Sequence, residues 1–383
     1  MRNGIFGAKL RHAVSAPRFQ PQKVGMNVPH TEHRRVKLTD LAEKTGFTVG
    51  TISKALQNKE GISQETRETI LKAAKEIGYI ANSQAGGLRS GSTKTVAIII
   101  SDITNPFFAI EIKTCISALE KYGYSAIVMD TDESAEREEQ AVISAINKNV
   151  DGVLLCPTQH STDPIRLLQQ NGMPFVLVGR RFTDFEAPYV ICNDEQGGYL
   201  AGQHLTQLGH RRIMLVTASP RISSSCERLQ GFRRAMSEMD IPLLPELTYE
   251  SDVSAHDAVR IVEDALAAGQ EFTAVCAFSD YLAWEIIFAL NRRGLRVPQD
   301  VSVVGFDDVQ SQLYFPPPLT TIHTPIQQIC TQSVELLLGQ IRNKAPKDAQ
   351  YIFETRLVVR ETTSLPRAAS APEAARKQFN PKP

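Results

Sequence analysis

Residue types suited to catalysis are present in this sequence, but their spacing matches no catalytic or metal site. There is no Gly-x-Ser-x-Gly turn, no phosphate-cradling Gly-x-x-x-x-Gly-Lys-Ser/Thr loop and no His-Glu-x-x-His pair. The eight histidines lack metal-ligand spacing, and the six cysteines include no Cys-x-x-Cys pair. We therefore expect no enzyme, no metal or other cofactor, and cysteines that are reduced core thiols.

One short segment instead carries small polar side chains suited to nucleic acid. In Thr48-Val-Gly-Thr-Ile-Ser-Lys54, the hydroxyls of Thr51 and Ser53 can donate to phosphate oxygens or base edges. The charge agrees, because residues 1–92 hold 15 Lys and Arg against 7 Asp and Glu, whereas residues 93–383 hold 27 against 35. A basic head on an acidic body indicates that the head contacts a polyanion.

Two adjacent aromatic residues could hold a small ligand. Phe107 and Phe108 begin a helix candidate just beyond the carboxyl end of a strand candidate. One or both rings could stack on the apolar face of a sugar ring or a base, and core packing is the alternative for each. Asn105 is either a ligand contact or the residue that caps the same helix.

Residues 36–80 have the pattern of three short helices. Thr39, Thr48 and Ser63 can each cap the first turn of a helix, and Gly46 can end the first helix with φ > 0. Three helices in about 40 residues, the first two joined by a tight glycine turn, predict a helix-turn-helix unit. The alternative is a small helical bundle without a ligand, which the local charge and the polar second helix make less attractive.

Residues 95–345 alternate between strands and helices. The expected strands are 95–101, 124–129, 152–156, 174–178, 188–192, 212–216, 246–249, 273–278 and 301–305. The expected helices are 107–121, 135–148, 163–171, 195–208, 225–238, 254–268, 280–293 and 324–341. Continuous apolar strands are typical of parallel sheets buried on both faces. The pattern predicts an open α/β design of two lobes, with ligands bound beyond the carboxyl ends of the strands.

The remaining segments are short. Residues 1–34 indicate a disordered arm, or else Met26 is the true start. Residues 351–360 are expected to form a final strand pair, followed by a loose tail. No apolar run approaches the roughly 20 residues that span a bilayer, and the N-terminus lacks the apolar stretch of a secretory signal. We therefore expect a cytoplasmic protein.

Several motifs together resemble one family. Val36-Lys-Leu-Thr-Asp-Leu-Ala-Glu-Lys-Thr-Gly-Phe-Thr-Val-Gly-Thr-Ile-Ser-Lys-Ala-Leu56 resembles the DNA-binding head of the lactose/galactose repressor (LacI/GalR) family, as do residues 61–67 and 78–82. Similar matches follow in the family's order and spacing at Asp102-Ile-Thr-Asn-Pro-Phe-Phe108, Val150-Asp-Gly-Val-Leu154, Leu208-Gly-His-Arg-Arg-Ile213, Arg228-Leu-Gln-Gly-Phe232, Val304-Gly-Phe-Asp-Asp308 and Pro317-Pro-Leu-Thr-Thr-Ile322. The resemblance covers roughly residues 36–365. It implies a homodimeric transcription regulator that responds to a sugar-type ligand.

The resemblance also implies a domain plan. An all-α helix-turn-helix head is joined to an α/β, two-lobed, periplasmic-binding-protein-like (type I) effector domain. The expected segments are an arm at 1–34, the head at 35–81, a hinge helix at 82–92, the effector domain at 95–366 and a tail at 367–383. Lobe 1 is expected at about 95–193 and 322–344, and lobe 2 at about 194–321 and 345–366.

On the DNA side, the resemblance places 48–56 as the recognition helix in the major groove, beginning at Thr48. Val49 and Gly50 then match the positions that choose the operator, and Val49 can touch a thymine methyl group. Lys54 stands where the family usually has Arg. Because Lys is a flexible point charge that cannot grip guanine through two parallel hydrogen bonds, we expect relaxed or altered base preference there.

The hinge is expected to begin at Asn82 and to insert Leu88 into the minor groove, as the family's hinge does. Gly86 and Gly87 depart from the family pattern by replacing better helix formers, at about 1 kcal/mol of helix stability each relative to Ala. The hinge should therefore be weakly helical away from DNA. The alternative is that this segment is only a linker.

The ligand side is expected between the lobes. By resemblance, Arg228 reaches ligand hydroxyls or a carboxylate, and Asp280 and Asp307 accept hydrogen bonds from ligand hydroxyls. A structural cap is the alternative for Asp307. The expected ligand-binding residues are therefore Asn105, Phe107, Phe108, Arg228, Asp280 and Asp307.

The main prediction is a repressor of a carbohydrate or related catabolic operon. Its dimer should bind a pseudo-palindromic operator, and a sugar or sugar acid in the cleft should shift the hinge between ordered and disordered states. Induction and corepression both fit this scheme, and an activator differs only in where its operator lies. A solute-binding protein would have an export signal and no DNA head, and a sugar-acting enzyme would have a defined catalytic pair. The tail has no leucine heptad, which favours a dimer over a tetramer.

Overall fold

The computed structural model describes residues 36–80, 92–252, 257–311, 317–346 and 348–367. The chain divides into two compact units, residues 1–82 and 83–383. The predicted DNA contacts Asn82 and Leu88 lie outside the described residues, as do the arm at 1–34 and nearly all of the predicted hinge and tail.

The head consists of three helices, α1 (Leu38–Thr45), α2 (Val49–Leu56) and α3 (Gln64–Ile77). They pack through Leu41, Ile52 and Ile70, which are fully buried. The helix ends follow the sequence, because Thr48 and Ser63 cap α2 and α3 as predicted, and Gly46 ends α1 at φ 71°. The predicted cap at Thr39 is wrong. The Asp40 carboxylate accepts a hydrogen bond from the Lys37 backbone N–H (2.7 Å), so α1 starts earlier and Thr39 lies in its first turn.

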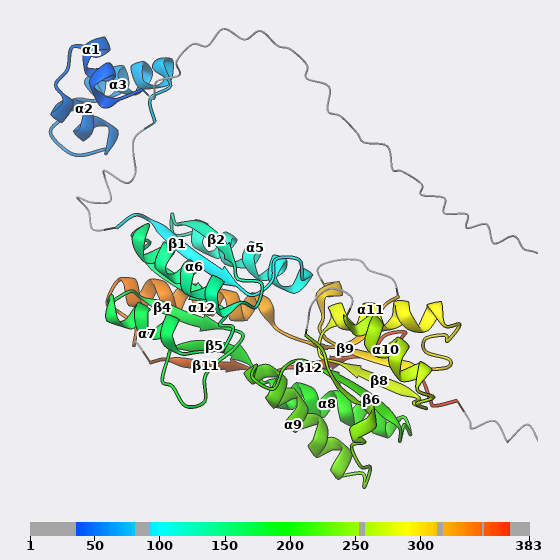
Figure 1. Ribbon diagram of the computed structural model, residues 1–383. Helices are drawn as coiled ribbons and strands as arrows, with labels where there is room; N and C mark the ends of the chain where they lie inside the picture. Colours follow the sequence, from blue (N-terminus) through cyan, green and yellow to red (C-terminus); the bar gives the residue numbers. More distant parts are fainter. Residues whose placement is uncertain (1–35, 81–91, 253–256, 312–316, 347, 368–383) are drawn as a thin grey trace, which may run out of the picture. The chain divides into compact units, whose positions relative to one another are not determined.

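The first lobe of the second unit is built on a six-stranded parallel sheet in the order β11-β5-β4-β3-β1-β2 (Figure 1). Its strands are β1 (Thr95–Ile100), β2 (Ser125–Asp130), β3 (Gly152–Leu155), β4 (Phe175–Val178), β5 (Tyr189–Cys192) and β11 (Gln350–Phe353). Its helices are α5 (Pro106–Glu120), α6 (Ala135–Asn147), α7 (Asp163–Gln170) and α12 (Ile326–Ile341). Strands β1, β3 and β4 are continuous buried apolar runs, as the sequence predicts for a covered parallel sheet.

The second lobe repeats the plan with the strand order β12-β10-β9-β8-β6-β7, in which only β12 runs antiparallel to its neighbour. Its strands are β6 (Ile213–Thr217), β7 (Thr248–Glu250), β8 (Ala274–Ala277), β9 (Ser302–Asp307), β10 (Thr320–His323) and β12 (Arg356–Val358). Its helices are α8 (Asp194–Gln207), α9 (Ser223–Ser237), α10 (Asp257–Ala267) and α11 (Asp280–Arg292), with short 3₁₀ turns η1 (Pro245–Leu247) and η2 (Val309–Ser311).

The chain passes between the lobes three times, after β5, after β10 and after β11. Two predictions are corrected here. Residues 351–360 do not form a strand pair, because β11 pairs with β5 of the first lobe whereas β12 pairs with β10 of the second. The predicted second-lobe segment 345–366 is therefore wrong in its first part. Strand β10 was not predicted at all.

Helices α8 and α9 approach each other unusually closely, and glycines make this possible. A Cβ atom on Gly198 would lie 2.0 Å from the carbonyl oxygen of Arg228, and one on Gly231 would lie 1.8 Å from that of Glu195. Only glycine fits at either position. This contact brings Arg228 on α9 next to the first residue of α8.

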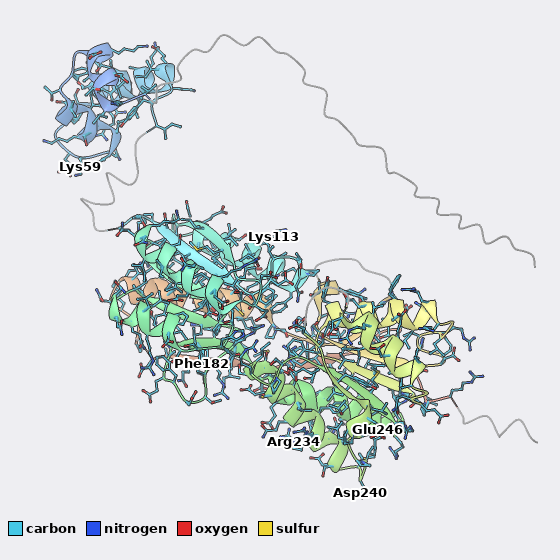
Figure 2. The ribbon with its side chains drawn as sticks, in the orientation of Figure 1. Lys59, Lys113, Phe182, Arg234, Asp240 and Glu246 are labelled. Atoms are coloured by element: carbon cyan, nitrogen blue, oxygen red, sulfur yellow. The ribbon has the colours of Figure 1, made fainter. Side chains whose placement is uncertain are left out.

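The charged residues labelled in Figure 2 lie on the surface of the units, as Lys113 on α5 and Arg234 on α9 illustrate. The described part of the chain contains no helix long and apolar enough to cross a membrane.

Candidate ligand cavity and nucleic-acid interface

The outward face of α2 has the small polar character that the sequence predicts. Ile52 and Ala55 point into the head, while Val49, Gly50 and Lys54 are exposed. The side chain of Val49 is 44% exposed, which leaves its methyl groups accessible to a partner.

Three hydroxyls of this helix already take part in hydrogen bonds. The Thr48 hydroxyl accepts from the Thr51 backbone N–H (3.2 Å) and lies 3.0 Å from the Thr51 hydroxyl. The Ser53 hydroxyl accepts from the Gln57 side chain (3.4 Å). Each hydroxyl keeps capacity for a further hydrogen bond. The three helices are nearly neutral, because residues 36–80 hold seven Lys or Arg and six Asp or Glu, so most of the basic charge counted for 1–92 lies outside them.

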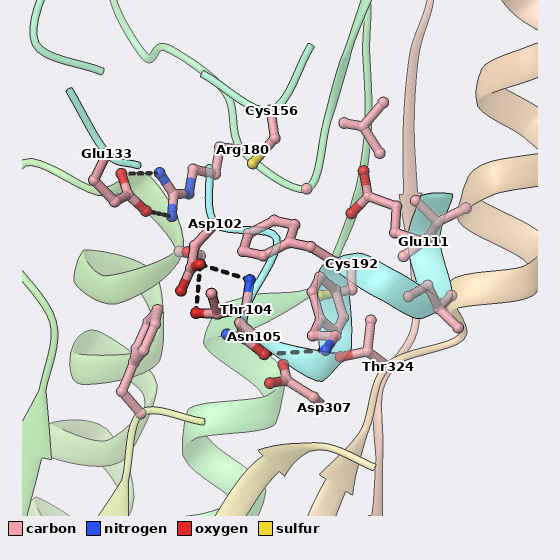
Figure 3. A pocket seen from close by; sticks show the side chains of 18 of the residues that line it. Asp102, Thr104, Asn105, Glu111, Glu133, Cys156, Arg180, Cys192, Asp307 and Thr324 are labelled. Carbon is pink, nitrogen blue, oxygen red and sulfur yellow. Dashed lines mark hydrogen bonds and ion pairs between the residues drawn. The ribbon is translucent and has the colours of Figure 1, made fainter. Parts of the chain in front are cut away.

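A cavity of about 640 Å³ lies between the two lobes of the second unit (Figure 3). It opens at the carboxyl ends of the strands, where a parallel α/β sheet binds ligands. The lining comes from both lobes and comprises Asp102, Thr104, Asn105, Phe107, Phe108, Glu111, Asp130, Asp132, Glu133, Cys156, Val178, Gly179, Arg180, Cys192, Ser224, Arg228, Asp252, Phe278, Asp307, Thr324, Ile326 and Ile329. Five of the six predicted ligand-binding residues are among them.

The start of α5 supplies the aromatic wall. Phe107 and Phe108 meet edge to face, with ring centroids 5.5 Å apart. Phe108 is 7% exposed and belongs to the core, whereas Phe107 is half-buried and keeps more of its surface for a ligand. Asn105 caps the helix, because its side-chain oxygen accepts from the Phe107 backbone N–H (3.0 Å). Its predicted role as a cap is confirmed, and it lines the cavity as well.

The second lobe contributes Arg228, held by several groups at once. Its Nε donates to Asp194 (2.7 Å) and its Nη1 to the carbonyl oxygen of Phe278 (2.6 Å). The rings of Phe306 and Phe278 lie 3.5 and 4.5 Å from its Cζ atom. Its Nη2 lies 3.8 Å from Asp307, beyond hydrogen-bond distance. This guanidinium is fixed in place while one nitrogen remains available to a ligand.

The backbone at Asp307 supports its assignment to the site. Asp307 ends β9 with a backbone φ of 116°, a conformation that residues other than glycine rarely adopt. Such strain gathers at binding sites. Burial raises the pKa of the Asp307 and Asp194 carboxyls, and the neighbouring Arg228 opposes the shift.

Sequence reasoning missed the arginine of the first lobe. Arg180 follows β4, and its two terminal nitrogens donate to both oxygens of Glu133 (3.0 and 2.6 Å) and to the carbonyl oxygen of Pro157 (3.0 Å). Figure 3 shows the paired bonds to Glu133. Its place just after a buried strand was a signal that could have found it.

Glu111 was also missed. It lies on α5, four residues after Phe107 and so on the same helical face, which was the available signal. It is 3% exposed and lines the cavity. Burial raises the pKa of its carboxyl to about 8, against the opposing charge of Arg180.

One predicted ligand contact is wrong. Asp280 is completely buried and is not part of the cavity lining. Its carboxyl accepts from the Val309 backbone N–H (2.9 Å) and from the Thr321 hydroxyl. It therefore ties α11 to η2 and β10 within the second lobe, away from the cavity.

These features define a class of protein: a two-lobed ligand-binding body carried in one chain with a helix-turn-helix head. Residues 37–82 match the model of bacterial regulatory proteins of the lacI family, and residues 203–363 match that of a periplasmic binding protein-like domain.

Similar proteins agree with this class. The chain is 31% identical to the HTH-type transcriptional repressor PurR of Vibrio vulnificus, over 85% of this chain and 98% of the relative. It is also 31% identical to the ribose operon repressor of Haemophilus influenzae, with the same coverage of this chain and 98% of that relative. A lac repressor dimer bound to operator and an anti-inducer is similar in structure, with a TM-score of 0.75, 25% identity, and coverage of 86% of this chain and all of the other. The chain belongs to the lacI family and is a DNA-binding transcriptional regulator, which confirms the resemblance seen in its motifs.

Proposed function

We propose that this regulator is a repressor whose operator binding is controlled by a small polyhydroxylated effector in the cavity between the lobes. The observation that carries the proposal is the built lining, in which Phe107 offers an aromatic face and Arg228 and Asp307 offer polar groups from the opposite lobe. An aromatic wall with a few converging polar groups suits a sugar ring. A relative named for a ribose operon and a similar regulator solved with bound ribose support the same class of effector.

The relative orientation of the two lobes would couple effector binding to operator affinity. A ligand that touches Phe107 on one lobe and Arg228 on the other stabilises one relative orientation of the two. Such a ligand changes operator affinity only if it binds that orientation better than the alternative. The same logic serves an inducer and a corepressor.

On DNA, we propose that α2 enters the major groove of each half of a pseudo-palindrome bound by a homodimer. Val49, Gly50 and Lys54 carry the exposed face, and Thr48, Thr51 and Ser53 contact phosphates or base edges. The contacts at Asn82 and Leu88 stay predictions. Operator binding would place the protein at the nucleoid, in the cytoplasm.

The test is selection of bound fragments from the source genome by the purified full chain at physiological salt. We expect one pseudo-palindrome to be enriched, flanked by genes of a carbohydrate pathway. The variant Lys54→Gln should lose most of the affinity for that site. Lys72→Gln removes another exposed lysine, on α3, and serves as the matched control, with affinity close to that of the wild type.

Failure to enrich any site, with and without sugar mixtures, would contradict the proposal. A site enriched upstream of the promoter, at a position where bound protein recruits polymerase, would favour an activator. Equal loss of affinity in both lysine variants would mean that α2 is not the recognition element.

A further inference from the structure

Glu111 places a buried carboxyl group against the cavity, and no described residue pairs with it. Glu111 is 3% exposed, and no described side chain or backbone group forms a hydrogen bond or ion pair with its carboxyl. In Figure 3 the side chain of Glu111 extends from α5 with no dashed line to any neighbour. A buried carboxyl is costly without a partner, so this one is a place for a group that the ligand supplies.

The groups that interact electrostatically with Glu111 do not supply that partner. Arg180 acts on it through its charge from the end of β4, but both terminal nitrogens of Arg180 already bond to Glu133. Cys156 after β3 and Cys330 on α12 are buried thiols, which are weak donors.

The whole lining is also strongly acidic. Among the described residues, seven carboxyl groups and two cations, Arg180 and Arg228, line the cavity, and each arginine has a carboxylate partner of its own. Burial raises the pKa values of Glu111 and Asp307, but the other five carboxyl groups still outnumber the two arginines, so an anionic ligand would meet a net negative field. A cationic ligand would meet a field that attracts it and, at Glu111, a free acceptor.

We propose that the effector is an amino sugar, and that Glu111 binds its protonated nitrogen while the aromatic wall and Arg228 hold the ring. This inference rests on the proposed function of the cavity and narrows it, because it disfavours the sugar acid that the sequence allowed. A cation within hydrogen-bond distance favours the ionised carboxyl. Binding of the ammonium group therefore releases the proton that burial keeps on Glu111 near neutral pH.

Thermal unfolding of the full chain with three equimolar pools provides the test. One pool holds glucosamine, galactosamine and mannosamine, the second holds the parent hexoses, and the third holds the corresponding hexonic acids. We expect the amino pool alone to raise the melting temperature, and calorimetry then to measure the affinity for each of its members.

Two variants assign the contact. Glu111→Gln keeps the shape of the side chain and removes its charge, and we expect it to weaken amino-sugar binding about 10- to 100-fold. Glu120→Gln makes the same change at an exposed position of the same helix and should bind like the wild type. Circular dichroism of both variants confirms that they are folded.

The results separate failure of the amino-sugar inference from failure of the cavity's proposed function. Stabilisation by the hexose or acid pool instead of the amino pool would overturn the inference and leave the cavity's proposed function standing. Stabilisation by no pool would overturn both. Amino-sugar binding that Glu111→Gln leaves intact would overturn the role of Glu111.

Discussion

Arg180 and Arg228 line the same cavity from opposite lobes, yet they have different amounts of hydrogen-bonding capacity left. Both terminal nitrogens of Arg180 donate hydrogen bonds to Glu133, and Nη1 also donates to the Pro157 carbonyl oxygen. Arg228 is anchored through Nε and Nη1, while its Nη2 has only a 3.8 Å approach to Asp307.

This difference separates a structural arginine from a binding arginine. Arg180, which donates three hydrogen bonds to other groups of the first lobe, fixes the shape of that lobe around the cavity. A guanidinium held by aromatic rings and two bonds is already oriented and still has donors for a ligand. Proximity to the cavity is therefore a weaker guide to function than the number of unused donors.

The largest loss of stability at a fixed pH should come from breaking the ion pair between Glu133 and Arg180. Glu133→Ala leaves Arg180, which is 6% exposed, without its carboxylate, and we expect it to lower the free energy of unfolding by about 3–5 kcal/mol. Urea denaturation measures this change. Glu139→Ala, at an exposed position on the neighbouring α6, should stay within about 0.5 kcal/mol of the wild type. A loss of less than about 1 kcal/mol at Glu133 would show that Arg180 is not a structural element.

A smaller effect, confined to the ligand, should follow from changing the available arginine. Arg228→Lys keeps the charge but loses the planar fork and the ring contacts, and we expect effector affinity to fall about 10- to 100-fold. Operator binding without effector should change little. Arg180→Lys is the companion variant, and it should affect stability more than affinity. A reversal of these two patterns would reverse the assignment of the two arginines.

Local sequence patterns predicted what depends on neighbours in the chain. The caps Thr48 and Ser63 predicted the starts of α2 and α3, and the continuous apolar runs predicted most strands to within about two residues. Strand β11 was assigned to the wrong lobe and β10 was missed, because short strands next to loops pair with segments that are distant in the sequence. Their place depends on pairing across the sheet, which no local period contains.

The residues of the cavity also separate into those that local motifs predict and those that only the fold shows. Phe107 and Arg228 were accessible through motifs, and both line the cavity. Asp280 was misplaced because a carboxyl after a strand looks the same in sequence whether it meets a ligand or, as here, the Thr321 hydroxyl. The pairing of Arg180 with Glu133, 47 positions apart in the chain, needs the fold to be seen.

The third contrast depends on pH and concerns Glu111, which lacks the carboxylate partner that both arginines have. Its pKa is about 8 in the folded protein against an ordinary value of 4.5, because burial outweighs the charge of Arg180. Between these two pH values the folded state binds the extra proton, so stability falls as the pH rises, at up to about 1.4 kcal/mol per pH unit. Glu111→Gln cannot titrate and should lack this contribution.

The ligand-free wild type should therefore lose stability relative to Glu111→Gln steadily from about pH 5 to about pH 8, with no further divergence above that. Asp194 and Asp307, whose pKa values are also raised by burial, occur in both proteins and cancel in the difference. Urea denaturation at a series of pH values measures it. Parallel stability curves would mean that the Glu111 carboxyl already has a partner in the empty cavity, and the contrast with the two paired arginines would then fail.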